Sequence, residues 1–207
     1  MGYKQIRDRL KVISESVLSP IIAFFDRIGI TPNMLTLFGL TVNIAAAFLI
    51  TSGFLPSAGL IILFAGVFDM LDGALARKTG KKSRFGGFLD SVTDRISEGA
   101  FYLAIVLLYI NEGKGPMAGL SYAAMFLSFL ISYIRARAGA MQIDCEEGFF
   151  TRTERIITLV LGLLFSPLFD SLSAAIWIIT IFSGITVAQR IYIVYIRANK
   201  TQKKKAK

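Results

Sequence analysis

Histidine is absent from this chain of 207 residues, and cysteine occurs once, at Cys145. A single cysteine cannot form an internal disulfide bond, so we expect Cys145 to be a reduced thiol in a cytoplasmic loop. Without histidine the chain lacks a common ligand for Zn²⁺ and the usual general base. Any bound metal should therefore be a hard cation with oxygen ligands, and any transferred proton must pass to a carboxylate, a lysine or a tyrosine.

The chain also lacks a linker, a low-complexity stretch and a soluble basic domain. Its formal charge of +9 therefore fits attraction to anionic lipid headgroups, and no nucleic-acid partner is expected. The N-terminal residues are charged and show no apolar stretch followed by a small-residue cleavage site, which disfavours a cleavable signal peptide. We expect a single membrane domain over residues 1–207.

Long apolar runs dominate the sequence, which is 54% hydrophobic and has a mean hydropathy of +0.61. Several runs reach the roughly 20 residues that a helix needs to cross a bilayer. They are continuously apolar, whereas barrel strands alternate, so we predict an all-α integral membrane protein with six transmembrane helices. The expected spans are 33–52, 56–77, 86–110, 116–138, 154–168 and 171–196.

Two further segments flank this six-helix bundle of residues 33–196. Residues 1–30 are expected to form an N-terminal juxtamembrane amphipathic helix on the membrane surface, and Thr31, Pro32 and Asn33 to begin the first span. Residues 197–207 form a basic tail. Of the 23 basic residues, only Lys114 falls in a loop opposite the two termini, which predicts that both termini and the active site face the cytoplasmic side of the cell membrane.

Four aspartates interrupt the second and third apolar segments: Asp69, Asp72, Asp90 and Asp94. The first two are three residues apart and the last two are four apart, so each pair lies on one helical face. Charged groups at membrane depth are costly and by default mark a functional site. Four neighbouring carboxylates would repel one another unless cations neutralised them, which predicts bound divalent metal, with Mg²⁺ favoured over Zn²⁺.

Parts of this pattern could instead be purely structural. One aspartate pair could form a helix–helix hydrogen-bonding site or a structural ion pair with Arg77 and Arg95. Gly73 and Gly86 could be small-residue packing contacts between helices. The lysines of the intervening loop, residues 78–82, are interpreted as topology determinants and are left out of the site.

Read in order, eight residues spell DxxDG(x)2AR(x)8G(x)3D(x)3D: Asp69, Asp72, Gly73, Ala76, Arg77, Gly86, Asp90 and Asp94. This pattern resembles the signature of the CDP-alcohol phosphotransferase family, and the segment TPNMLT at 31–36 resembles the family's entry to its first helix. The resemblance implies six membrane helices, a homodimer, two divalent cations and exchange of CMP for an alcohol on a CDP-linked lipid.

The resemblance also implies roles for individual residues. The four aspartates would be metal ligands for two Mg²⁺ ions, with Mn²⁺ as a substitute, and Asp94 would also be the base for the acceptor hydroxyl. Such ions would neutralise the pyrophosphate oxygens of the CDP-lipid. The residues expected to bind the CDP-lipid are Asn33, Thr36, Gly73, Ala76, Arg77 and Gly86. Among them, the small residues would admit the nucleotide to the helix backbone, and the arginine would contact a phosphate.

A second basic group points to the acceptor, because phosphate on the acceptor would need positive partners. The expected acceptor-phosphate contacts are Arg135, Arg152, Arg155 and Arg190, and Glu154 is expected to orient one of them. The segments SYIRARAGA, GFFTRTERI and AQRIY resemble the phosphatidylinositol-phosphate and archaetidylinositol-phosphate synthase branch of the family. Arg135, Arg137 and Arg152 could instead extend to the surface as ordinary cytoplasmic anchors.

The predicted reaction transfers a phosphatidyl-type group from CDP-diacylglycerol or CDP-archaeol to 1L-myo-inositol-1-phosphate, a step of phospholipid biosynthesis that releases CMP. Glycerol 3-phosphate is the closest rival acceptor, because it also presents a phosphate. A divalent-cation transporter is the rival from another class. The apolar outer half of the third span, residues 100–109, disfavours a transport path because it offers no polar trail across the membrane.

Overall fold

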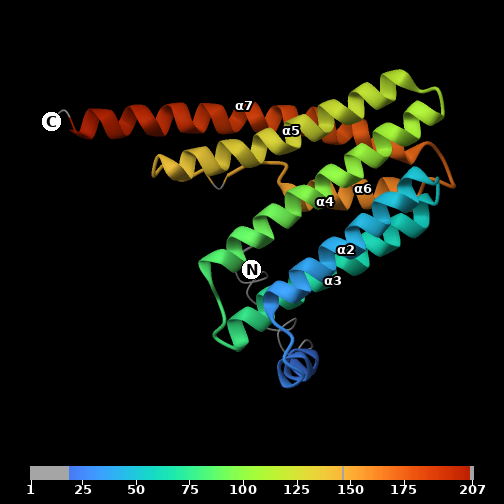
Figure 1. The fold of residues 1–207 in the computed structure, drawn as a ribbon. Helices are drawn as coiled ribbons and strands as arrows, with labels where there is room; N and C mark the ends of the chain where they lie inside the picture. Colours follow the sequence, from blue (N-terminus) through green and yellow to red (C-terminus); the bar gives the residue numbers. More distant parts are fainter. Residues whose placement is uncertain (1–18, 146, 206–207) are drawn as a thin grey trace, which may run out of the picture. The chain divides into compact units, whose positions relative to one another are not determined.

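The computed structural model describes residues 19–145 and 147–205, with side chains described up to residue 199. This part of the chain is built from helices and contains no strand. A helical stretch at residues 19–27 precedes six longer helices (Figure 1). These are α2 (Pro32–Thr51), α3 (Leu55–Lys78), α4 (Arg84–Asn111), α5 (Gly115–Ala140), α6 (Arg152–Leu164) and α7 (Ser171–Lys205). The predicted all-helical class and the positions of the six helices are confirmed.

The first of these helices begins where the sequence predicted. Thr31 precedes it, and its Oγ1 accepts a hydrogen bond of 3.4 Å from the backbone N–H of Met34. Pro32 occupies the first helical position, where its missing N–H costs nothing because that position has no intrahelical partner. The turns that follow α2, α3 and α4 each contain a glycine with positive φ, Gly53, Gly80 and Gly113. Glycine adopts this left-handed conformation without steric cost, so it permits the chain to reverse.

Two compact units make up the chain. Of the described residues, the first unit comprises 19–45 together with 61–97, and the second comprises 46–60, 98–145 and 147–205. The core of the first unit contains Ile22, Leu35, Leu71, Ala74 and Leu75. It therefore packs the 19–27 helix against the start of α2 and the end of α3.

Within the second unit, α7 packs against α5 and α6. Its contact with α6 is close, because a Cβ added to Gly162 would lie 2.5 Å from the Cβ of Ala175. Buried hydroxyls supply polar links: the Tyr109 hydroxyl lies 2.9 Å from Ser173 Oγ, and the Tyr102 hydroxyl 3.3 Å from Ser128 Oγ. Such hydrogen bonds between helices stabilise packing where lipid offers no alternative partner.

Within the described part of the chain, four helices are long and apolar enough to cross a membrane: α2, α3, α5 and the Ser171–Asn199 part of α7. Large apolar side chains on their outer surfaces are exposed, such as Phe48 at 71% and Trp177 at 52%. An outward-facing apolar surface of this kind suits lipid contact. Of the remaining two helices, α4 carries the acidic stripe and α6 has only 13 residues. The coarse prediction of a membrane protein with several long apolar helices holds, and the count of six spans stays a prediction.

Some predictions fall outside the described residues. Residues 1–18 of the expected amphipathic segment, and the last two residues of the basic tail, lie there.

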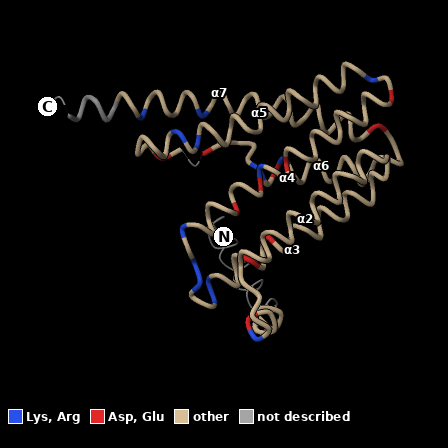
Figure 2. Tube along the Cα trace, in the orientation of Figure 1, with Lys and Arg blue, Asp and Glu red and all other residues tan. Residues whose placement is uncertain are grey.

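Basic residues do gather along the segment that joins α3 to α4, as the tube in Figure 2 shows. Cys145, expected to be a reduced thiol, is a free cysteine that is buried beside Ala138 and Ile143.

Candidate active site

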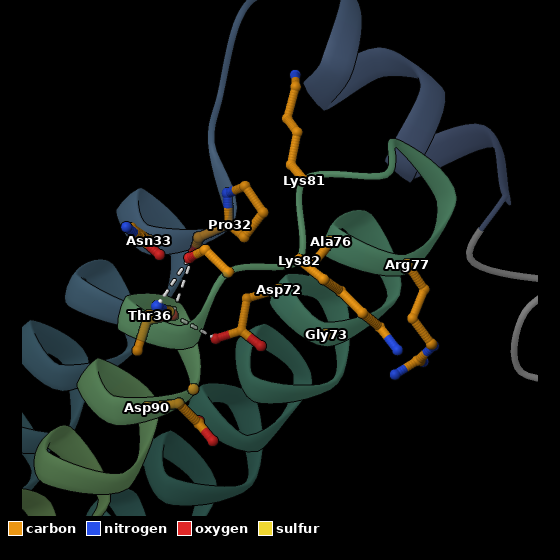
Figure 3. A pocket seen from close by; sticks show the side chains of 13 residues that line it. Pro32, Asn33, Thr36, Asp72, Gly73, Ala76, Arg77, Lys81, Lys82 and Asp90 are labelled. Carbon is orange, nitrogen blue, oxygen red and sulfur yellow. Dashed lines mark hydrogen bonds between the residues drawn. The ribbon is translucent and has the colours of Figure 1, made fainter.

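A cavity of about 280 Å³ lies in the first unit, bordered by the starts of α2 and α4 and the end of α3. Figure 3 shows the side chains that surround it. Its lining residues are Pro32, Asn33, Thr36, Asp72, Gly73, Ala76, Arg77, Lys81, Lys82, Ser83, Gly86, Gly87 and Asp90. All six residues predicted to bind a CDP-lipid are among them, and so are two of the four predicted metal ligands.

Asp72 is the most firmly held carboxylate of this cavity. It is buried, and the Thr36 hydroxyl donates a 2.6 Å hydrogen bond to its Oδ2. This bond joins α2 to α3 (Figure 3). A hydrogen bond to an ionised carboxylate is stronger than one between neutral groups, so it restrains the side chain at the cavity wall. Asp90, from α4, is half-buried and lines the same cavity.

The other two aspartates are not among the residues that line the cavity. Asp69 is half-buried one helical turn before Asp72, and its Oδ1 lies 3.4 Å from the position that a Cβ on Gly39 would take. Asp94 is half-buried one turn after Asp90, and its Oδ2 lies 3.6 Å from Nη1 of Arg95. Each pair thus follows one helical face, as the spacing predicts.

Two glycines of the signature sit where a side chain would collide. A Cβ on Gly86 would lie 3.2 Å from Oδ1 of Asn33 and 3.1 Å from Oγ of Ser83. Ser83 in turn accepts a 2.9 Å hydrogen bond from the N–H of Gly86 and so caps the start of α4. A Cβ on Gly73 would lie 3.3 Å from Nη1 of Arg77. The absence of a side chain at Gly86 therefore permits the close approach of α2 to α4, and its absence at Gly73 leaves room for the guanidinium of Arg77.

The carboxylates fit a hard divalent cation in their donor chemistry. They supply oxygen ligands, which Mg²⁺ and Mn²⁺ prefer, and the chain has no histidine to favour Zn²⁺. Within residues 19–145 and 147–205, however, no three His, Cys, Asp or Glu side chains form a group placed to hold a metal ion. Ionised carboxylates on adjacent faces repel one another, which favours side-chain conformations that separate them.

The predicted acceptor arginines all lie in the second unit. Arg155 is 1% exposed and forms a two-pronged ion pair with Glu98, with Nε–Oε1 at 2.7 Å and Nη2–Oε2 at 3.1 Å. Glu98 is equally buried and continues the stripe of Asp90 and Asp94 by one more turn of α4. Glu154, which was expected to orient one of the arginines, accepts a 2.7 Å hydrogen bond from the N–H of Thr151 in a capping box at the start of α6.

The side chain of Arg190 donates hydrogen bonds to two backbone carbonyl groups. Its Nε donates a 3.0 Å hydrogen bond to the carbonyl of Glu147, and its Nη1 donates a 2.8 Å bond to the carbonyl of Ile131. It therefore joins α7 to α5 and to the loop before α6. Arg152 is half-buried at the first position of α6, and Arg135 is exposed near the end of α5.

Sequence reasoning missed several residues that the structure places at these sites. Lys81 and Lys82 line the cavity although they were interpreted as topology determinants, and Ser83 caps α4 beside it. Loop residues such as these follow no periodic pattern, so the sequence does not indicate in which direction their side chains extend. Glu98 had a usable signal, because it stands four residues after Asp94 in an apolar segment.

Comparisons with known proteins agree with the signature. Residues 29–189 match the family model described as CDP-alcohol phosphatidyltransferase. The archaetidylinositol phosphate synthase of Methanothermobacter thermautotrophicus is 36% identical over 197 aligned positions, which cover 89% of this chain and 97% of that protein.

Solved structures resemble this fold closely. The crystal structure of Mycobacterium tuberculosis phosphatidylinositol phosphate synthase with CDP-DAG bound has a TM-score of 0.83 and 34% sequence identity, and the match covers 87% of this chain and 94% of that one. A second structure of that enzyme, in complex with manganese and citrate, has a TM-score of 0.79 and 35% identity, with 85% and 88% covered. A CDP-linked lipid and a divalent metal are thus each found bound to this relative.

Proposed function

This chain belongs to the CDP-alcohol phosphatidyltransferase family, and on that premise we propose that it transfers a phosphatidyl-type group from a CDP-lipid to inositol phosphate, releasing CMP. The observation that carries the proposal is the cavity that gathers Asp72 and Asp90 with every residue expected to bind the CDP-lipid. Two relatives named for inositol phosphate lipid synthesis, one from a bacterium and one from an archaeon, support inositol phosphate as the acceptor.

In this proposal the cavity holds the cytidine diphosphate end of the lipid. Arg77 contacts a phosphate oxygen, and Gly73 and Gly86, which carry no side chain, line the cavity and let the nucleotide approach the helix backbones. Asp69, Asp72, Asp90 and Asp94 would hold two divalent cations, Mg²⁺ or Mn²⁺, whose chemistry when bound is to neutralise charge on the phosphoryl oxygens. The hydrogen bond from Thr36 keeps Asp72 turned towards the cavity.

Asp94 is the proposed base. The acceptor hydroxyl loses its proton to this carboxylate while its oxygen forms a bond to the β-phosphorus of the CDP-lipid. The bond between that phosphorus and the bridging oxygen breaks, and CMP leaves with the electron pair.

The acceptor phosphate would be bound by arginines of the second unit, and we propose Arg135, Arg152, Arg155 and Arg190 as its contacts. Arg155 and Arg190 are buried and firmly held, whereas Arg135 is exposed and Arg152 half-buried. The two more accessible arginines are therefore the ones that a water-soluble phosphate could reach first. Bidentate guanidinium contacts suit phosphate better than an ammonium point charge does.

The biological setting follows from the same family membership. We propose a homodimer in the cell membrane, with both termini and the active site on the cytoplasmic side, in contact with anionic lipids. The basic residues of the α3–α4 loop support this orientation, since cytoplasmic loops are enriched in lysine and arginine.

The proposal is tested with purified protein by following CMP release from CDP-diacylglycerol and from CDP-archaeol. Inositol 1-phosphate, glycerol 3-phosphate, serine and free inositol compete as acceptors, and the lipid product is identified by mass spectrometry. We expect inositol 1-phosphate to give the dominant product. A dominant product from glycerol 3-phosphate would favour the rival acceptor, and CMP release with no acceptor at all would argue against transfer.

A divalent-cation transporter is the alternative of another class, and family membership weighs against it. The same protein in vesicles loaded with a Mn²⁺-sensitive dye separates the two. Cation uptake without CMP release would support transport and would overturn the enzymatic proposal.

A further inference from the structure

We propose that Lys82 is a binding residue for the diphosphate group of the CDP-lipid, acting with Arg77 across the cavity. The inference rests on the proposed function and adds a residue that lies outside the eight-residue signature. It assigns a chemical role to a lysine in a loop whose basic residues otherwise serve membrane topology.

The position of the side chain is the first observation. Lys82 lies between α3 and α4 and lines the cavity together with Arg77, Asp72 and Asp90. In Figure 3 its side chain extends in the direction of Gly73 and the Arg77 guanidinium. A Cβ on Gly73 would lie only 3.3 Å from Nη1 of Arg77, so the guanidinium occupies the space above that glycine. Two cationic groups therefore face one cavity from the two sides of a short loop.

The neighbouring lysines differ from Lys82 in what they contact. Nζ of Lys81 donates a 2.8 Å hydrogen bond to Oδ1 of Asp26, and Nζ of Lys78 donates a 2.6 Å bond to Oγ of Ser19. Both partners belong to the 19–27 helix, so one bond joins that helix to the end of α3 and the other joins it to the loop that follows α3. Figure 3 accordingly shows the Lys81 side chain extending away from Asp72 and Asp90, opposite to that of Lys82.

Charge supports an anionic ligand between Lys82 and Arg77. An anion placed between two cationic side chains is attracted by both of them. The diphosphate of a CDP-lipid carries two negative charges. Two divalent cations would be shared by the four aspartates and the diphosphate, and their four positive charges would leave two of the six negative charges to the two basic side chains. A lysine adds an adaptable point charge, whereas the arginine supplies directed hydrogen bonds.

The test measures binding, so it is independent of turnover. Calorimetric titration of the full-length protein with Mg²⁺ compares CDP-glycerol, a soluble diphosphate diester, with CMP, which has one phosphate. Lys82→Ala should weaken CDP-glycerol binding about 10-fold, the size of one hydrogen bond to a charged group, and CMP binding by less than about 2-fold. Lys78→Ala is the matched control, because it removes an equal charge from the same region without lining the cavity.

Each outcome separates the possibilities. A selective loss in Lys82→Ala with unchanged binding in Lys78→Ala supports the inference, and Lys82→Arg should retain most of the affinity. Two results would overturn it: equal CDP-glycerol affinities in the two alanine variants, or equal weakening of CDP-glycerol and CMP binding in Lys82→Ala. Either result would mean that Lys82 contributes only its general positive charge and makes no specific contact with the diphosphate. If the unmodified protein bound neither ligand, the proposed function itself would fail, and this inference with it.

Discussion

Removal of the Glu98 charge should destabilise the protein more than any change on its surface. The Glu98–Arg155 pair is two-pronged, at 2.7 and 3.1 Å, and both side chains are only 1% exposed. Glu98→Gln would leave the Arg155 guanidinium buried without a countercharge, and breaking such a pair typically costs about 3 to 5 kcal/mol. For a chain of this size that cost corresponds to a fall of about 10 °C in Tm.

The assay is thermal unfolding in detergent, followed by the fluorescence of Trp177, the one tryptophan. Lys114→Ala is the control, because it breaks an ion pair with Glu112 whose side chains are 49% and 41% exposed, and exposed pairs contribute little. The double variant Glu98→Leu with Arg155→Met should recover much of the loss, since neither charge is then buried alone. A Tm for Glu98→Gln equal to that of the control, or a double variant as unstable as the sum of both single ones, would refute the reasoning.

Three further predictions concern the two sites. Asp94→Asn should retain CDP-lipid binding and lose at least about 100-fold in turnover, the usual contribution of a general base; a near-normal rate would remove Asp94 from that role. Chelation of Mg²⁺ and Mn²⁺ should abolish CMP release, and activity that survives thorough chelation would contradict the ligand assignment. Hydrogen bonds from Arg197 hold the pKa of Glu147 below its ordinary value of 4.5, so they stabilise the loop residues 147–150 above that pH and are lost as the pH falls through the lowered pKa. Amide exchange in this loop should therefore quicken under acid once the intrinsic rate is corrected, while Glu147→Gln should show no such dependence.

The sequence predicted the helices well because their signals are local. Each apolar run is long, and residues such as Thr31 with Pro32 or the positive-φ Gly53 mark a start or a turn by their own chemistry. The signature likewise placed Asp72, Gly86 and Asp90 at one cavity, because helical spacing determines which residues share a face.

Contacts between residues that lie far apart in the sequence could not be predicted from it. Nothing near Arg155 in the sequence reveals that its partner is Glu98, 57 residues earlier, and the nearer Glu154 was expected to orient one of the arginines. The bonds of Lys78 and Lys81 to the 19–27 helix, and the different direction of the Lys82 side chain, follow no periodic pattern. Pairings of this kind are set by how helices pack, which local propensity does not encode.

The brevity of α6 has a consequence for where a soluble substrate meets a lipid. Its 13 residues rise about 20 Å, whereas the hydrocarbon core of a bilayer is about 30 Å thick. If the far end of α6 reached the opposite edge of the hydrocarbon core, its start, which carries Arg152 and Arg155, would lie about 10 Å inside that core. A water-soluble phosphate could then meet these arginines only through a water-filled recess, because hydrocarbon offers no partner for its charge.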